Sequence, residues 1–115
     1  MGRLTTHVLD TSLGVPAKGL KIELYALELD RQKIAEAVTN TDGRCDAPLL
    51  EGEAFHFGQF ELVFYAGDYL EATGQSLPSP KFLDHIPIRF GMAEDRHYHV
   101  PLLLSAFGYS TYRGS

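Results

Sequence analysis

The stretch HYHVPLLLS at residues 97–105 decides the fold class of this chain. Successive side chains of a β-strand point to opposite faces of a sheet, so every second residue shares a face. One face of this stretch is an apolar row that consists of Tyr98, Val100, Leu102 and Leu104. The other face carries His97, His99 and Pro101. This alternation predicts a strand that packs its apolar row against a core and presents two histidines outward.

Six further segments have compositions and alternations typical of strands. They are residues 3–10, 20–27, 32–40, 58–66, 86–92 and 108–114. A turn near Asp30 and Arg31 separates residues 20–27 from residues 32–40, so the two segments are expected to pair as a hairpin. The turn sequence NTDG at residues 40–43 ends the second of them. About seven strands with little helix predict an all-β, two-sheet sandwich rather than a doubly wound α/β fold.

Residues 67–74, GDYLEATG, predict a single short helix. Asp68 is a favourable N-cap residue, and Gly74 is a favourable residue for the helix end. About two turns are too few to be stable alone, so tertiary packing must hold this helix. The whole chain, residues 1–115, is expected to be one domain because its length suits one core and no repeat or linker divides it.

Charge and composition argue against several classes of function. The net charge of −5 and the lack of a Lys/Arg cluster argue against nucleic-acid binding. No apolar run reaches membrane-spanning length and the first residues lack a secretory signal, so we expect a cytoplasmic protein without membrane partners. Cys45 is the one cysteine, which excludes an internal disulfide. No dinucleotide- or phosphate-binding loop is present, so no cofactor is expected.

Outward histidines are the first candidates for a functional site. His7 lies on the less apolar face of residues 3–10, and His97 and His99 share the outer face of residues 97–105. Solvation alone explains many such histidines, and three imidazoles from two strands are also a ligand set for zinc. The sequence leaves both alternatives open beside catalysis, because it does not show whether the strands meet. His56 and His85 are expected at the surface.

Two further features are ambiguous when each is taken alone. Arg44 follows a turn, where most arginines are solvated. The final residues YRGS, 112–115, hold a tyrosine that can pack and an arginine that can be a simple surface charge. Chain ends usually fray, so a tyrosine and an arginine in the last four residues suggest that the tail has a role. We predict that the tail lines an active site.

Taken together, four segments resemble a known family, the transthyretin-like 5-hydroxyisourate hydrolases of urate breakdown. They are TTHVLDTSLGVPAKG (5–19), TNTDGRCDAPLL (39–50), HYHVPLLLS (97–105) and YRGS (112–115). The resemblance covers essentially the whole chain. It implies two four-stranded sheets with one short helix, an eighth strand within residues 45–50, and a homotetramer of two dimers with active sites at the dimer–dimer interface.

The resemblance also implies the site residues and the reaction. The implied catalytic residues are His7, Arg44, His99 and Ser115. The implied substrate-binding residues are His97, Tyr112, Arg113 and Gly114. The implied reaction is hydrolysis of a ring C–N bond of 5-hydroxyisourate without metal or cofactor, giving 2-oxo-4-hydroxy-4-carboxy-5-ureidoimidazoline. A water molecule activated by histidine is the expected nucleophile, because no nucleophile elbow surrounds Ser115. The rival readings are a transthyretin-like small-ligand carrier and an interaction module.

Overall fold

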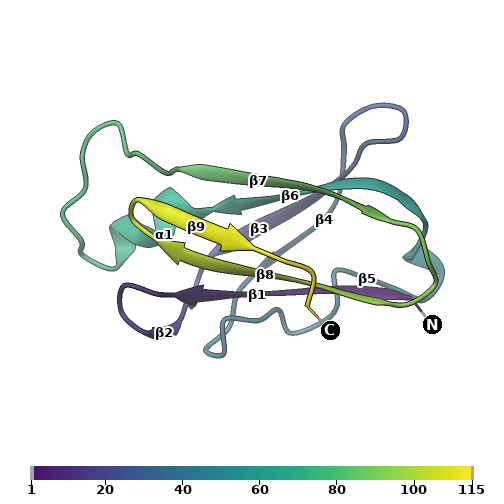
Figure 1. Ribbon diagram of the computed structural model, residues 1–115, viewed down its shortest axis with the longest axis horizontal. Helices are drawn as coiled ribbons and strands as arrows, with labels where there is room; N and C mark the ends of the chain where they lie inside the picture. The colour runs from purple at the N-terminus through teal and green to yellow at the C-terminus, as the bar shows by residue number, and fades with distance from the viewer. Residues whose placement is uncertain (1, 115) are drawn as a thin grey trace.

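The computed structural model describes residues 2–114 and confirms an all-β sandwich of two sheets with one short helix (Figure 1). The first sheet has the strand order β2-β1-β8-β9, with β5 also paired to β1, and the second has the order β4-β3-β6-β7. The strands are β1 (Arg3–Asp10), β2 (Val15–Pro16), β3 (Lys21–Ala26), β4 (Gln32–Val38), β5 (Leu50–Glu51), β6 (Gly58–Tyr65), β7 (His85–Met92), β8 (His97–Ser105) and β9 (Gly108–Thr111). The helix α1 spans Ala66–Ala72, and a 3-10 turn, η1, spans Gly52–Ala54.

The seven longer strands lie where the sequence pattern predicts them, and β3 and β4 form the expected hairpin. Two-residue strands account for the differences, since β2 was not predicted and β5 begins only at Leu50, at the end of the segment expected to hold an eighth strand. The first sheet therefore has five strands instead of four. The predicted last strand is also shorter, because β9 ends at Thr111.

The start of the helix differs from the prediction, whereas its end agrees. Asp68 is not the N-cap residue: Tyr65 occupies that position without a side-chain cap, and Asp68 lies in the first turn. The reason is that α1 begins at Ala66, directly after the last residue of β6, so no loop precedes it. Gly74 follows the helix with φ +82°, a conformation that glycine adopts without strain.

The core lies between the two sheets and is built from the inner faces of the longer strands. Apolar residues alternate inward along β1 and β8, and residues of β3 and β6 face them from the second sheet. Fully or almost fully buried positions of these four strands include Leu4, Val8, Ile22, Leu24, Phe60, Leu62, Phe64, Val100, Leu102 and Leu104. Burial of these rows is the main favourable contribution to folding, so it also determines which side chains of β1 and β8 remain outside.

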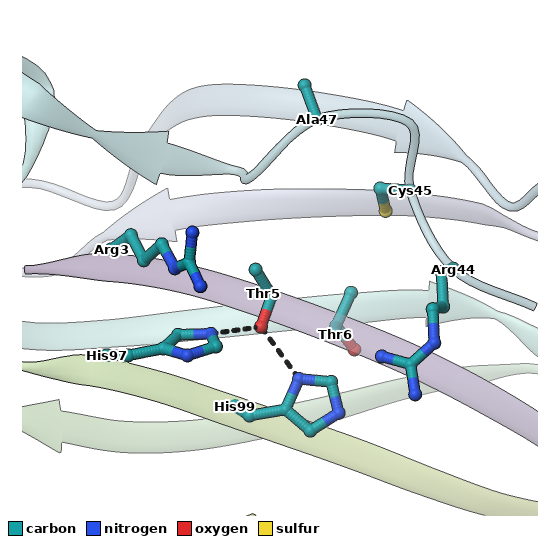
Figure 2. A pocket seen from close by; sticks show the side chains of 8 residues that line it. All are labelled: Arg3, Thr5, Thr6, Arg44, Cys45, Ala47, His97 and His99. Carbon is teal, nitrogen blue, oxygen red and sulfur yellow. Dashed lines mark hydrogen bonds between the residues drawn. The ribbon is translucent and has the colours of Figure 1, made fainter.

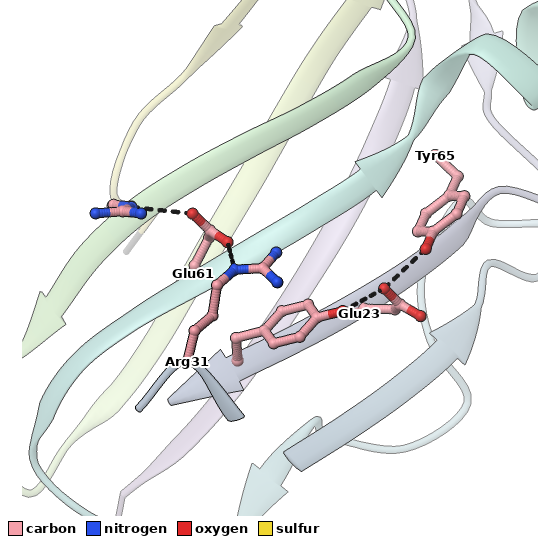
Figure 3. A network of polar contacts seen from close by, with 6 residues as sticks. Glu23, Arg31, Glu61 and Tyr65 are labelled. Atoms are coloured by element: carbon pink, nitrogen blue, oxygen red, sulfur yellow. Dashed lines mark hydrogen bonds and ion pairs between the residues drawn. The ribbon is translucent and has the colours of Figure 1, made fainter. Parts of the chain in front are cut away.

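Two carboxylates lie almost buried on the outer face of the second sheet, where they are held by cationic and phenolic groups (Figure 3). Glu61 is 4% exposed and accepts hydrogen bonds from Arg31 Nε at 2.7 Å and Arg89 Nε at 2.9 Å. Glu23 is 6% exposed and accepts hydrogen bonds from the hydroxyls of Tyr25 and Tyr65, each at 2.8 Å. These pairs compensate the desolvation that an isolated buried carboxylate would suffer.

We expect Glu23 to contribute stability that depends on pH. Burial alone raises the pKa of Glu23, but hydrogen bonds from Tyr25, Tyr65 and Lys33 outweigh it and lower the pKa to about 2. A folded-state pKa below the ordinary value of 4.5 means that this stabilisation is complete above pH 4.5 and is lost as the pH falls toward 2. Glu23→Gln should therefore lower the free energy of unfolding by about 2 kcal/mol near neutral pH.

Urea denaturation of the native protein and of Glu23→Gln at pH 7 and at pH 3 tests this expectation. The difference between the two proteins should shrink at the lower pH, because the Glu23 carboxylate binds a proton there in the unfolded chain while it stays charged in the folded one. An equal difference at both pH values would show that the charge of Glu23 does not stabilise the fold.

Candidate active site

The outer face of the first sheet brings three histidines and a threonine together, and Figure 2 shows Thr5 bonded to two of them, His97 and His99. β1 and β8 pair in parallel, and their register places Thr5 opposite His99 and Arg3 opposite His97. Thr5 Oγ1 lies 2.6 Å from His97 Nε2 and 2.7 Å from His99 Nδ1. The opposite ring nitrogen of His99, Nε2, lies 2.6 Å from His7 Nδ1. The three contacts form one continuous hydrogen-bonded chain from His97 to His7.

The turn at residues 40–43 carries Arg44 to the same place. Arg44 forms an isolated antiparallel bridge with His7, and the Val8 N–H next to it donates to the Gly43 carbonyl at 2.8 Å. Gly43 has φ +73°, and a Cβ atom built there would lie 2.4 Å from the Val8 carbonyl oxygen. Only glycine fits so close to β1 in this conformation, which explains why it precedes the functional arginine candidate.

A cavity of about 350 Å³ opens beside the histidines. Its lining residues are Arg3, Thr5, Thr6, Arg44, Cys45, Ala47, His97 and His99. Figure 2 shows Arg3 and Arg44 at opposite ends of this group, with Thr5 between them. Two guanidinium groups and neutral imidazoles suit a small polar molecule that is rich in carbonyl oxygens, because guanidinium donates several hydrogen bonds in fixed directions.

The environment of the histidines keeps their rings neutral. Burial, the neighbouring imidazoles of His7 and His97 and the Arg44 guanidinium together lower the pKa of His99 to about 4, and burial is the largest of these causes. Burial and then Arg44 lower the pKa of His7, and burial and then Arg3 lower the pKa of His97. At neutral pH each ring therefore has one bare nitrogen, which is the form that accepts a proton in general-base catalysis.

The imidazoles are arranged as a hydrogen-bonded chain and do not converge on one point. Both ring nitrogens of His99 are engaged, one by Thr5 and the other by His7. Within residues 2–114, no group of three His, Cys, Asp or Glu side chains is placed to hold a metal ion. No helix of the described chain is long and apolar enough to cross a membrane.

The end of the described chain is held against His99. The Gly114 N–H donates to the His99 carbonyl at 2.7 Å, and a Cβ atom built on Gly114 would lie 2.8 Å from Cδ2 of the His99 ring. Tyr112 and Arg113 line a different cavity of about 220 Å³, next to β7. Within a single chain, therefore, these two residues do not line the histidine cavity. Ser115, predicted as a catalytic residue, lies outside the described residues.

Comparison with known proteins identifies the relationship of this chain. A model of the HIUase/Transthyretin family matches residues 4–114. The chain belongs to this family. Within it, 5-hydroxyisourate hydrolase 2 of Rhizobium meliloti (strain 1021) is 63% identical over 116 residues, covering 99% of this chain and 97% of the relative.

Solved structures that superimpose on this chain include a 5-hydroxyisourate hydrolase and a transthyretin in complex with thyroxine. The 5-hydroxyisourate hydrolase of Klebsiella pneumoniae superimposes with a TM-score of 0.84 at 33% identity, covering all of both chains. Sea bream transthyretin in complex with thyroxine superimposes with a TM-score of 0.86 at 27% identity, covering 97% of this chain and 94% of that chain. The fold alone therefore does not distinguish hydrolysis from ligand binding in this family.

Several polar residues of this cavity, among them Arg3 and Thr5, were not predicted from the sequence as site residues. Both lie on the same face of β1 as His7, and that alternation was the available signal. Their partners, however, lie more than 90 positions away on β8, as in the pairs Thr5–His97 and Thr5–His99. Only the register between the two strands reveals these contacts. His56 and His85 are exposed, as predicted.

Proposed function

We propose that this chain is a hydrolase that opens the six-membered ring of 5-hydroxyisourate at a C–N bond, giving 2-oxo-4-hydroxy-4-carboxy-5-ureidoimidazoline. The observation that carries the proposal is the chain of neutral imidazoles beside a cavity that contains Arg3 and Arg44. The names of the similar hydrolases support the choice of substrate. A carrier needs no such chain of imidazoles, so the site favours catalysis.

In the proposed reaction the oxygen of a water molecule bonds to the ring carbonyl carbon. A bare nitrogen of the His7–His99 pair takes one proton of that water, and the C–N electron pair goes to the ring nitrogen, which receives a proton in return. Arg44 stabilises the negative charge that develops on the carbonyl oxygen. The lowered pKa values of His7 and His99 keep these rings ready to accept the proton at neutral pH.

The decisive experiment follows the absorbance of freshly generated 5-hydroxyisourate with and without the protein, with no added cofactor. Micromolar protein should accelerate the decay well above the spontaneous rate. An unchanged decay rate would refute the hydrolase assignment. Saturable binding of the substrate or of thyroxine without turnover would instead support the carrier alternative, for which the sea bream structure provides the precedent.

We also propose that the working form is a homotetramer with sites at the dimer–dimer interface. Within the described residues, β7 and β9 are each paired on one side only, and such edges need protection in a stable protein. Light scattering should give about four times the chain mass of 12.8 kDa. A fully active protein of monomer mass would contradict both the assembly and the interfacial site.

Removing Gly114 and Ser115 should lower the rate of hydrolysis at least tenfold, about 1.4 kcal/mol of transition-state stabilisation. The deletion removes the Gly114 hydrogen bond to the His99 carbonyl and therefore loosens the strand that positions the His99 ring. Light scattering and circular dichroism serve as controls, because the deletion removes no core side chain. Normal turnover with normal mass would show that these two residues take no part in catalysis.

A further inference from the structure

The hydroxyl of Thr5 bridges the rings of His97 and His99. It lies within 2.7 Å of a ring nitrogen of each histidine, and all three side chains are half-buried. We infer that Thr5 relays a proton between His99 and His97, so that His7, His99, Thr5 and His97 act as one proton-conducting chain. This inference rests on the proposed hydrolysis, and it assigns a role to a residue outside the implied catalytic set.

Counting hydrogens shows why the four groups act together. A threonine hydroxyl has one proton, so it donates to one of its two histidines and must accept from the other. The contact between His7 Nδ1 and His99 Nε2 likewise needs one hydrogen between two nitrogens. With all rings neutral, only two arrangements satisfy every contact.

The two arrangements differ in direction. In the first, His7 Nδ1–H donates to His99 Nε2, His99 Nδ1–H donates to Thr5, and the Thr5 hydroxyl donates to His97 Nε2. In this arrangement Nε2 of His7 is bare and Nδ1 of His97 carries a hydrogen. In the second arrangement every donor and acceptor is exchanged, so Nε2 of His7 carries the hydrogen and Nδ1 of His97 is bare.

Transfer of one proton converts the first arrangement into the second. A proton from water binds Nε2 of His7, and the Nδ1 proton of His7 moves to Nε2 of His99. The Nδ1 proton of His99 moves to Thr5 Oγ1 while the hydroxyl proton moves to Nε2 of His97. The proton on Nδ1 of His97 then leaves, so one proton enters the chain, one leaves, and no charge accumulates. Hydrolysis of an amide needs this balance, because water loses a proton and the leaving nitrogen gains one.

The fold holds Thr5 in the geometry that the relay requires. Thr5 is paired with His99 in the parallel β1–β8 register, and the buried neighbours Leu4 and Thr6 anchor this part of β1 on the core side. Threonine is β-branched, so its χ1 angle has few accessible values and its hydroxyl has a defined direction. Thr5 is therefore a positioning residue that acts through His97 and His99.

Substitution of Thr5 tests the relay directly. Thr5→Val keeps the shape but removes the hydroxyl, so kcat should fall about tenfold with KM unchanged, whereas Thr5→Ser should keep kcat within about threefold of the native value. Thr11→Val is the matched control. It also removes a threonine hydroxyl that donates to a β8 group, the Leu104 carbonyl at 3.1 Å, but this hydroxyl is not part of the histidine chain. Native kcat in Thr5→Val would overturn the inference.

A double substitution distinguishes a relay from simple support of the His99 ring. If His97 is the far end of the chain, His97→Ala should lower kcat by a factor similar to that of Thr5→Val. The kcat of the double variant should then be about equal to that of either single variant. Native kcat in His97→Ala would overturn the relay. Multiplied losses in the double variant would also overturn it, because they would show two independent roles.

Nuclear magnetic resonance of protein labelled with ¹⁵N in histidine provides a readout without turnover. The ring-nitrogen signals of His7 should shift in Thr5→Val but not in Thr5→Ser, although Thr5 does not contact His7, because the tautomers are coupled through His99. Unchanged His7 signals in Thr5→Val would overturn the coupling. A native protein that shows this coupling but no hydrolysis would refute the proposed function and retain the hydrogen-bonded chain.

Discussion

His99→Ala should lower kcat/KM for 5-hydroxyisourate at least a hundredfold, about 2.7 kcal/mol of transition-state stabilisation. His99 is the centre of the imidazole chain, since one ring nitrogen contacts Thr5 and the other contacts His7. Its loss both removes a proton acceptor and separates His7 from His97. No other substitution of a single histidine breaks two of the three contacts.

The control for this variant is His85→Ala, which also removes one imidazole. His85 is exposed on β7, where its ring lies 4.2 Å from the ring of Tyr65, measured between centroids. This variant should retain native kcat/KM. Absorbance assays of both variants, together with circular dichroism, separate a catalytic loss from a folding defect. Comparable rates in His99→Ala and the native protein would remove His99 from the proposed mechanism.

Gly43→Ala, in the turn before Arg44, should strongly lower both stability and activity. A Cβ atom there lies 2.4 Å from the Val8 carbonyl oxygen, and the residue has φ +73°. The positive φ alone costs about 1 to 2 kcal/mol, and the clash with the backbone of β1 adds to it. We expect the free energy of unfolding to fall by about 3 kcal/mol, with a loss of activity because Arg44 moves away from His7.

Gly14→Ala isolates the two contributions. Gly14 has a similar φ of +71°, but a Cβ atom built there meets no atom within 4 Å. This control should therefore cost only the conformational penalty of about 1 to 2 kcal/mol and leave activity unchanged. Urea denaturation measures both variants. Equal losses of stability would show that the approach of the turn to Val8 does not constrain residue 43.

Much of the fold was predictable because the relevant signals are local. The alternation of apolar and polar residues places β1 at Arg3–Asp10 and β8 at His97–Ser105, and it assigns His97 and His99 to the outer face. Gly74 likewise predicts the helix end from its own backbone preference. Strands of two residues show no alternation, so β2 and the bounds of β5 were not predictable in this way.

The candidate site was predictable only in part. The motifs that the chain shares with its family predicted His7, Arg44 and His99 as site residues. The structure brings these three residues together. Their catalytic roles, and that of Ser115, remain predictions. The tail was expected to line the same site, yet Tyr112 and Arg113 line another hollow of their own chain while Gly114 lies against His99.

The sequence by itself determined which faces of β1 and β8 are buried, because that choice depends only on the spacing of apolar residues along each strand. Only the tertiary structure decided that the two strands lie side by side, in parallel, with Thr5 opposite His99. Residues separated by more than 90 positions meet there because both apolar rows must fill the same core at once. That requirement involves the whole chain, so a local sequence pattern cannot predict the register between β1 and β8. The contacts of Thr5 with His97 and His99 depend on that register.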